Sequence, residues 1–294
     1  MRWFKRVLLI AIAAILLGPV LSWVGLYFLQ DRFLFMPRAF SATTPTPTDR
    51  GMGYYEEVWL TARDGVRSFA WFVPAPRSSP ERAPALLWLH SNGGNIAGRL
   101  PRLRALRHHL DASVLLLDYR GYGLSKGEPS EAGILTDAEA AFAHLSSRPG
   151  LSPERIVLYG RSMGGAVAAI QAGKTPCAGL ILESTFISVP AMAAYRFPIL
   201  PFVREVSRHS LDARAAVRTL DLPLLSIHGT DDPIVPFEQG RAVFEAAQSR
   251  DKRFVRLDGV GHHDSHRTGA PYFEPIVEFV TRVAPARLEK PPAP

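Results

Sequence analysis

The chain has 294 residues, of which 47% are hydrophobic and 21% are charged, a composition that suits one large α/β domain and excludes a disordered chain. Its net charge of +7 comes mostly from scattered arginines, without a basic block that interleaves aromatic residues, so nucleic-acid binding is not expected. Cys177 is the only cysteine, which excludes a disulfide framework and a thiolate metal site and leaves the redox compartment open.

The first thirty residues combine a basic start with a long apolar run. After MRWFKR no charged residue occurs from Val7 to Leu29, about 23 residues where about 20 are needed to cross a bilayer. Aromatic residues crowd the far end of the run. Residues 1–30 are therefore predicted to be an uncleaved transmembrane helix, with a cleaved signal peptide as the alternative. The basic start is expected in the cytoplasm, which places the rest of the chain on the extracytoplasmic (periplasmic) side, although Arg32 and Arg38 weaken this charge asymmetry.

The remainder is predicted to be one domain that follows a linker. Residues 31–53, rich in Ser, Thr and Pro, are the expected linker. Over residues 54–286 near-continuous apolar strands, such as ALLWLHS, SVLLLDYRG and GLILEST, alternate with helices, which indicates a mostly parallel sheet with helices on both faces. A hairpin turning at residues 63–65 is expected to add an antiparallel edge. Residues 185–220 interrupt the alternation and are predicted to form a short helical lid, and residues 287–294 a C-terminal tail.

The stretch LYGRSMGGAVA carries the first sign of chemistry. It places Ser162 in a G-x-S-x-G motif between an apolar strand and an Ala/Gly-rich helix. Such a serine sits in a tight turn that projects its hydroxyl above the sheet, and the glycines are needed because side chains there would strike the neighbouring strand and helix. The following helix directs its first amides, including that of Met163, at negative charge developing beside the serine. Ser162 is thus the predicted nucleophile and Met163 an oxyanion donor.

A serine hydroxyl is a weak nucleophile near neutral pH and needs a base that is held by an acid. The segment IHGTDDPIVP ends one expected strand with Asp231 and Asp232, and DGVGHHDSH after the last strand offers His262, His263 and His266. These histidines also permit a metal site, but no other cluster of ligands completes it. Neither a metal nor a cofactor is expected.

Five segments in this order, LHSNGGN, DYRGYGLSKG, GRSMGG, HGTDDPIVP and GVGHH, resemble the α/β-hydrolase superfamily, and the resemblance runs over roughly residues 55–285. More narrowly, the chain is similar to membrane-anchored, short-lidded serine hydrolases of the Bem46 type. The joint match is specific for fold and mechanism but says little about the substrate. It implies an α/β-hydrolase fold with a Ser-Asp-His triad that works through a covalent acyl-enzyme.

The resemblance also implies roles for individual residues. It places the acid of the triad at Asp232, with Glu183 at the end of GLILEST as a rival, and the base at His262. The second oxyanion donor is expected to be the backbone amide of Asn92 in HSNGGN. The family usually has glycine where this chain has Ser91, which puts the detail of the oxyanion hole in question.

The function expected from these residues is hydrolysis of a carboxylic ester or thioester, with a small acyl ester or lipid-like molecule as substrate and the N-terminal helix in the membrane. A serine peptidase of the same fold is the first alternative, and a non-catalytic, membrane-tethered binding domain is the second. The oligomeric state stays open. The predicted lid contains apolar side chains that either line an acyl groove above the serine or pack the lid onto the sheet, namely Phe186, Met192, Tyr195, Phe197, Ile199, Leu200 and Phe202.

Overall fold

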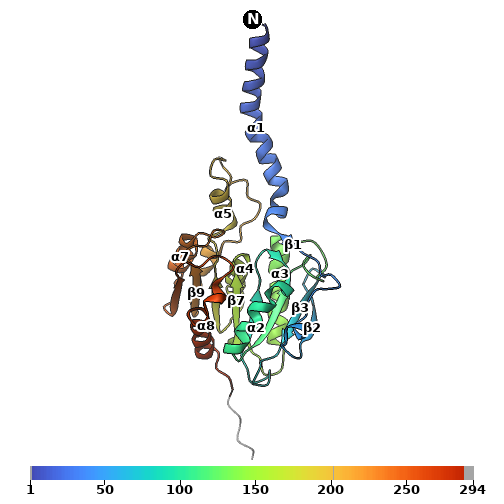
Figure 1. The fold of residues 1–294 in the computed structure, drawn as a ribbon, viewed down its shortest axis with the longest axis vertical. Coiled ribbons are helices and arrows are strands. Elements are labelled where there is room, and N and C mark those ends of the chain that lie inside the picture. Colours follow the sequence, from blue (N-terminus) through green and yellow to red (C-terminus); the bar gives the residue numbers. More distant parts are fainter. Residues whose placement is uncertain (1, 201, 288–294) are drawn as a thin grey trace, which may run out of the picture.

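The computed structural model describes residues 2–200 and 202–287, and over these residues eight strands form one sheet in the order β10-β9-β8-β7-β4-β6-β3-β2 (Figure 1). In this sheet β3 runs antiparallel to β2 and β6, and the remaining pairs are parallel, which confirms the mostly parallel sheet with a hairpin at one edge. The strands are β2 (Glu56–Thr61), β3 (Arg67–Val73), β4 (Ala85–Leu89), β6 (Ser113–Asp118), β7 (Ile156–Arg161), β8 (Gly179–Glu183), β9 (Leu224–Gly229) and β10 (Lys252–Leu257).

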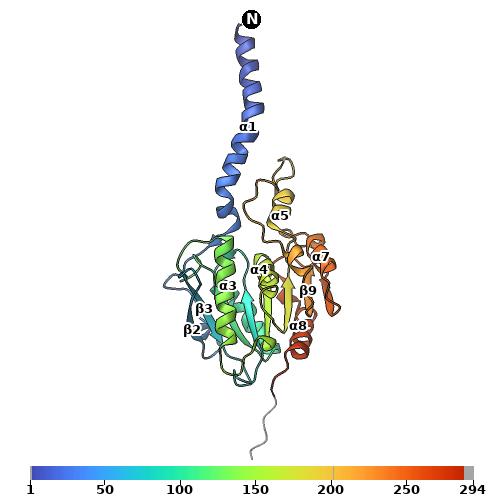
Figure 2. The same cartoon turned by 180° about the vertical axis from the view of Figure 1, so that it is seen from behind.

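Both faces of the sheet are buried under helices. On β7 the side chain of Leu158 packs in one apolar cluster and that of Tyr159 in the other, because successive side chains of a strand point to opposite faces. One face is covered by α2 (Leu100–His109) and α8 (Ala270–Val283), in front of the sheet in Figure 1. The other face, seen in Figure 2, is covered by α3 (Glu131–Ser146), α4 (Met163–Ala172), α6 (Ala213–Val217) and α7 (Phe237–Ala246).

The predicted lid divides into two parts with different environments. Its first part contains α5 (Val189–Arg196) and rises beyond the carboxyl ends of the strands (Figure 1). Its second part contains α6, which packs against α4 and α7, and buries Ala213 and Val217 of this helix and Leu211 just before it. The lid is therefore shorter than residues 185–220, because the apolar face of α6 belongs to the core of the domain.

The N-terminal helix α1 (Arg2–Leu34) extends a few residues past the predicted boundary at residue 30 and points away from the domain (Figures 1 and 2). Over the described residues, no helix combines the length and the apolar character needed to cross a membrane.

The segment predicted to be a linker contacts the domain. After α1, strand β1 (Met36–Pro37) pairs in parallel with β5 (Gly93–Gly94) in the loop that follows β4. Phe35 and Met52 are buried against the domain, so residues 31–53 are attached to it at both ends.

The short 3-10 helices are η1 (Thr48–Arg50), η2 (Ile96–Arg99), η3 (Pro153–Arg155) and η4 (Ser265–Thr268). Of the predicted tail, residues 288–294 lie outside the described residues.

Candidate active site

Ser162 lies at a strained turn between β7 and α4. Its backbone has φ 53° and ψ −120°, a conformation that costs energy for a residue with a side chain and that the surroundings must hold in place. The Ser162 amide donates to the Glu183 carbonyl oxygen at 2.8 Å. A Cβ on Gly160 would lie 2.2 Å from the Gly164 oxygen, and a Cβ on Gly164 would lie 2.0 Å from the Leu89 oxygen. Because strand and helix approach so closely, only glycine fits at either position.

The structure brings together two residues from loops that are far apart in sequence. His262 follows β10 and Asp232 follows β9, and the His262 Nδ1 lies 2.6 Å from the Asp232 Oδ2. The other oxygen of Asp232 accepts the backbone N–H groups of Ile234 at 2.9 Å and Val235 at 2.8 Å. His228 lies 3.5 Å from the Asp232 carboxylate and bonds to the Val235 oxygen at 3.0 Å. The carboxylate is thus fixed on several sides and oriented toward His262.

The electrostatics of this pair favour a charged acid and a neutral base. Burial by itself would raise the pKa of Asp232, but the nearby His228 and the hydrogen bond from His262 outweigh it and hold that pKa well below its usual range. Burial lowers the pKa of His262 below its ordinary value, while the hydrogen bond to Asp232 opposes this shift. At neutral pH the imidazole is therefore largely unprotonated and able to accept a proton.

The neighbouring candidates face other groups. Asp231 is exposed and accepts a hydrogen bond from the Thr230 hydroxyl at 2.9 Å. His263 is exposed, with its Nδ1 at 3.2 Å from an Arg161 nitrogen, and the Nδ1 of His266 lies 3.2 Å from an Arg102 nitrogen. Within the described part of the chain, no three His, Cys, Asp or Glu side chains are arranged to hold a metal ion.

Ser162 and His262 line the same cavity, although the Ser162 hydroxyl makes no hydrogen bond to any residue that the structure describes. Asn92 and Met163, the two predicted oxyanion donors, also line this cavity. Neither backbone N–H has a protein acceptor among residues 2–200 and 202–287. The Asn92 carbonyl oxygen accepts the Tyr122 hydroxyl at 2.6 Å, which fixes the loop.

The Ser91 hydroxyl lies 3.4 Å from an Arg161 nitrogen. Ser91 is buried. This departure from the usual glycine therefore gives the oxyanion loop a contact with Arg161.

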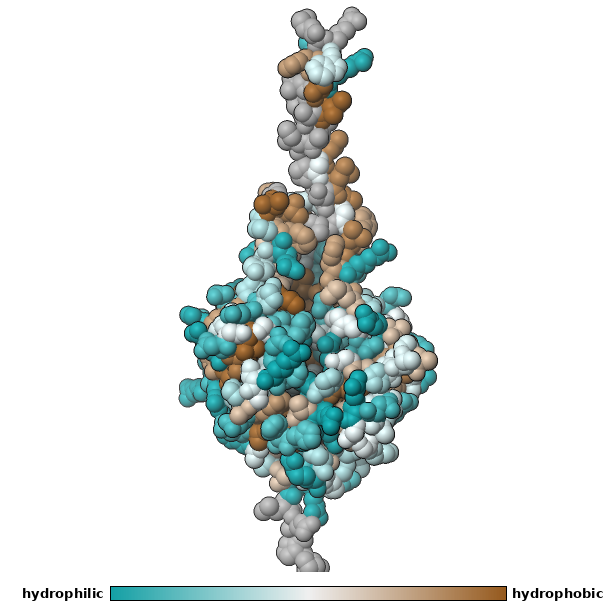
Figure 3. All heavy atoms as spheres, viewed as in Figure 1, coloured by the Kyte–Doolittle hydropathy of each residue, from teal (hydrophilic) through white to brown (hydrophobic). Residues whose placement is uncertain are grey.

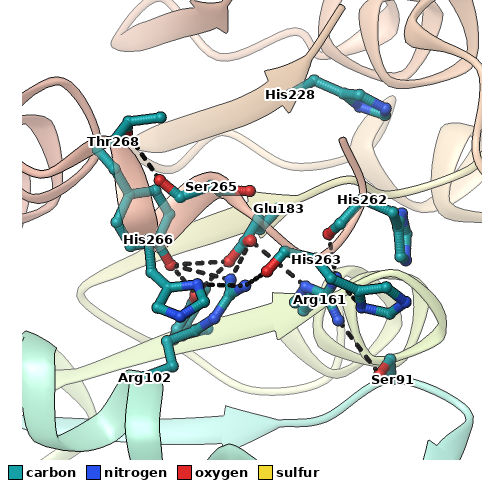
Figure 4. A network of polar contacts seen from close by, with 12 residues as sticks. Ser91, Arg102, Arg161, Glu183, His228, His262, His263, Ser265, His266 and Thr268 are labelled. Carbon is teal, nitrogen blue, oxygen red and sulfur yellow. Dashed lines mark hydrogen bonds and ion pairs between the residues drawn. The ribbon is translucent and has the colours of Figure 1, made fainter. Parts of the chain in front are cut away.

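A buried ionic network that is not predicted from the sequence lies beside the site (Figure 4). Glu183 is fully buried and accepts hydrogen bonds from Arg102, from Tyr159, from Tyr272 at 2.9 Å and from the Arg161 Nε at 3.3 Å. Glu183 is thus a partner of arginines and not of His262. The signal that was available is the charged residue in GRSMGG, at the end of an otherwise apolar strand.

Arg161 connects this network to the loops that carry His262 and Ser91. Its terminal nitrogens reach the His262 carbonyl oxygen, the His263 Nδ1 and the Ser91 hydroxyl. Figure 4 shows Arg161 between Glu183 and the loop that carries His262. One buried guanidinium therefore contacts both the histidine loop and the oxyanion loop.

The cavity above Ser162 has a volume of about 660 Å³ and lies between the lid and the end of α1. Of the lid residues expected to line a groove, Phe186, Met192 and Phe197 do so. Tyr195, Ile199, Leu200 and Phe202 are not among its lining residues, and Ile199 is 90% exposed. The end of α1 contributes Gln30, Phe33 and Leu34, which the sequence analysis had assigned to the anchor and linker.

Known proteins are similar to this chain in sequence and in fold. The sequence model of a family described as serine aminopeptidase, S33, matches residues 104–206 and 198–264. The chain is 35% identical to the alpha/beta hydrolase domain-containing protein WAV2 of Arabidopsis thaliana, over 93% of this chain and 94% of that protein. It is 34% identical to the protein bem46 of Schizosaccharomyces pombe, over 90% of each.

Solved structures agree with this relationship. An esterase of Pyrococcus furiosus superposes with a TM-score of 0.69 at 19% identity, covering 85% of this chain and 98% of the esterase. An alpha-beta hydrolase of Vibrio vulnificus gives a TM-score of 0.70 at 21% identity, covering 85% of this chain and 92% of that one. With the strand order, the turn at Ser162 and the extensive identity to bem46 and WAV2, these observations show that the chain belongs to the Bem46-like proteins of the α/β-hydrolase superfamily.

Proposed function

We propose that the protein is a serine hydrolase that cleaves carboxylic esters or thioesters with a triad of Ser162, His262 and Asp232. The observation that carries this proposal is the 2.6 Å contact between the buried Asp232 and His262, which lines the same cavity as Ser162 at its strained turn. His262 takes the proton of Ser162 as the hydroxyl oxygen attacks the acyl carbon. The amides of Asn92 and Met163 donate to the oxyanion, and the leaving group departs with the proton from His262.

The cavity supports an acyl substrate. Its walls near the lid and α1 are mostly apolar, and each buried methylene contributes about 0.8 kcal/mol. The acyl-enzyme forms at Ser162 and a water molecule, activated by His262, then releases the acid. We expect short-to-medium acyl chains to be preferred over acetyl.

The description of the matching family model, serine aminopeptidase, supports a peptidase as the second candidate. An aminopeptidase needs a negatively charged group for the substrate's amino terminus. Among the described residues that line the cavity, the ionisable side chains are Arg99, Arg196, His209, His262 and His263, and none is a carboxylate. This charge distribution favours an ester hydrolase over an aminopeptidase.

Labelling with a fluorophosphonate probe, followed by a panel of acyl esters, acyl thioesters and aminoacyl anilides, tests the proposal. We expect Ser162 to be labelled and esters or thioesters to be cleaved faster than any anilide. The control is Ser162→Ala, which should lose both labelling and turnover. Absence of labelling in the wild-type protein would favour the non-catalytic binding domain, and faster cleavage of anilides would favour the peptidase.

We also propose that residues 1–30 hold the protein at a membrane with its catalytic domain on the extracytoplasmic side. In support, Leu21 and Phe28 on α1 and Ile199 and Phe202 on the lid expose most of their side-chain surface. The lid and α1 lie side by side, since the rings of Trp23 and Phe202 are 5.4 Å apart. Apolar residues gather at this end of the molecule in Figure 3.

Alkaline carbonate extraction tests the anchor, and a C-terminal reporter tests the orientation. The protein should stay in the membrane pellet, and the reporter should be active outside the cytoplasm. A soluble mature protein that begins near residue 22 or later would instead indicate a cleaved signal peptide. A reporter that is active only in the cytoplasm would reverse the orientation.

A further inference from the structure

The side chain of Arg99, at the end of η2, stands apart from the other arginines near the site. It lines the cavity together with Asn92, Ser162 and His263, on the side of the oxyanion loop. One terminal nitrogen donates to the Gly93 carbonyl oxygen, whereas the Nε is buried without a hydrogen-bond partner. Arg99 is therefore only partly satisfied by the protein.

The charge of Arg99 is also not neutralised by an ion pair. Arg102 and Arg161 both contact Glu183, but no carboxylate among the described residues forms an ion pair with Arg99. Burial, and secondarily the nearby guanidiniums of Arg161 and Arg102, lower the pKa of Arg99 to about 10, which leaves it protonated at neutral pH. The Asp118 carboxylate opposes this shift without forming an ion pair with Arg99. A partly buried cation that lacks an ion pair is unfavourable unless an anion reaches it.

The other residues that line the cavity also differ in charge and polarity. The lining also includes the exposed His263 and, from the lid, Phe186, Met192 and Phe197. The described lining includes no Asp or Glu. From the lid, Arg196 and His209 also line the cavity, but Arg196 is exposed and His209 pairs with Asp31 at 2.6 Å. Arg99 is thus the partly buried arginine of this lining, and Phe186, Met192 and Phe197 form an apolar part on the lid.

We propose that Arg99 binds an anionic group, a phosphate or a carboxylate, on the alcohol side of the substrate ester. This inference rests on the proposed ester hydrolysis. The acyl chain lies in the apolar part, so the anion belongs to the half of the molecule that leaves. Ser162 attacks the acyl carbon, the bond from that carbon to the alcohol oxygen breaks, and His262 transfers the serine proton to this oxygen. The anionic alcohol departs, and water releases the acid from Ser162.

The test compares hydrolysis of 1-octanoylglycerol 3-phosphate and 1-octanoylglycerol by the full-length enzyme. These two substrates differ only in the phosphate. Charge-assisted hydrogen bonds predict a kcat/KM about 10- to 100-fold higher for the phosphate compound, mainly through KM. In Arg99→Gln this ratio should fall to near one, and Arg99→Lys should retain part of it. The matched control is Arg104→Gln, because Arg104 is exposed on α2 and outside the cavity lining, and it should keep the wild-type ratio.

The ratio separates recognition from a purely structural role. If Arg99 serves only to hold the Gly93 carbonyl, Arg99→Gln lowers both activities equally and the ratio stays at its wild-type value, which overturns the proposal. A wild-type enzyme that cleaves both compounds equally well also overturns it.

Calorimetric titration of glycerol 3-phosphate and of glycerate gives a readout independent of hydrolysis. Binding to the wild-type protein that is lost in Arg99→Gln supports the anion site even if no ester is cleaved, in which case only the proposed reaction fails. Tighter binding of one compound identifies phosphate or carboxylate as the preferred group. Absence of binding by both compounds to the wild-type protein contradicts the site.

Discussion

Replacing Glu183 by Gln removes the negative charge from the centre of the buried network while keeping its size. Arg102 and Arg161, both buried, then remain without their carboxylate. Breaking a buried ion pair in this way costs about 3–5 kcal/mol of stability, because an uncompensated charge stays in the interior. At roughly 2–3 °C per kcal/mol for a chain of this length, Tm should fall by about 6–15 °C.

Thermal unfolding followed by circular dichroism measures this change, with Glu245→Gln as the matched control. Glu245 pairs with Arg241 on the exposed face of α7 at 2.7 Å, so its substitution should move Tm by no more than about 2 °C. Equal shifts for Glu183→Gln and Glu245→Gln would show that the buried network does not hold the domain together, and the reasoning would be refuted.

The same variant makes a prediction about pH. Burial would raise the pKa of Glu183, but the charges of Arg102 and Arg161 outweigh it and hold this pKa far below its usual range. A lowered folded-state pKa gives stability that is present above the unfolded value, about 4.3, and is lost as the pH falls through the folded value. The difference in Tm between wild type and Glu183→Gln should therefore be constant between pH 7 and 5 and shrink below about pH 4.

Further predictions concern catalysis. Asp232→Asn should lower kcat for ester hydrolysis by about 10⁴-fold in steady-state assays, because Asp232 contacts His262. Asp231→Asn, at an exposed position, should keep most of the activity. Equal losses in the two variants would mean that the acid is misassigned. The base must be neutral and burial lowers the pKa of His262, so kcat/KM should fall as the pH decreases. The pH at which kcat/KM reaches half its maximum should lie below the ordinary histidine pKa of about 6.5. A midpoint above that value would contradict the assignment of His262 as the base. For saturated acyl esters, kcat/KM should rise by up to about fourfold per methylene until the cavity is full. Met192→Trp should shift the preferred acyl length to shorter chains, because Met192 lines the cavity. Tyr195→Trp should leave that preference unchanged, because Tyr195 is not a lining residue.

The local pattern of the sequence was sufficient for the architecture and for the turn at the serine. Apolar strands of five to seven residues that alternate with helices are typical of a sheet covered by helices on both faces, so the pattern predicted the mostly parallel sheet but not its strand order. The glycines of GRSMGG predicted a close approach of strand and helix, and Gly160 and Gly164 have no room for a Cβ. These features depend on residues that are neighbours in sequence, which is why the sequence reveals them.

The resemblance to the family assigned the acid to Asp232 and the base to His262, but only the tertiary structure shows which groups meet across the site. Nothing local distinguishes Asp231 from Asp232, because adjacent residues at the end of a strand differ only in the direction that the backbone gives their side chains. Glu183 meets arginines from α2 and β7, and α1 meets the lid, through contacts between segments separated by tens of residues or more. Such pairings depend on the path of the whole chain in space, since the burial and charge that govern them are properties of the packed interior and not of any short segment.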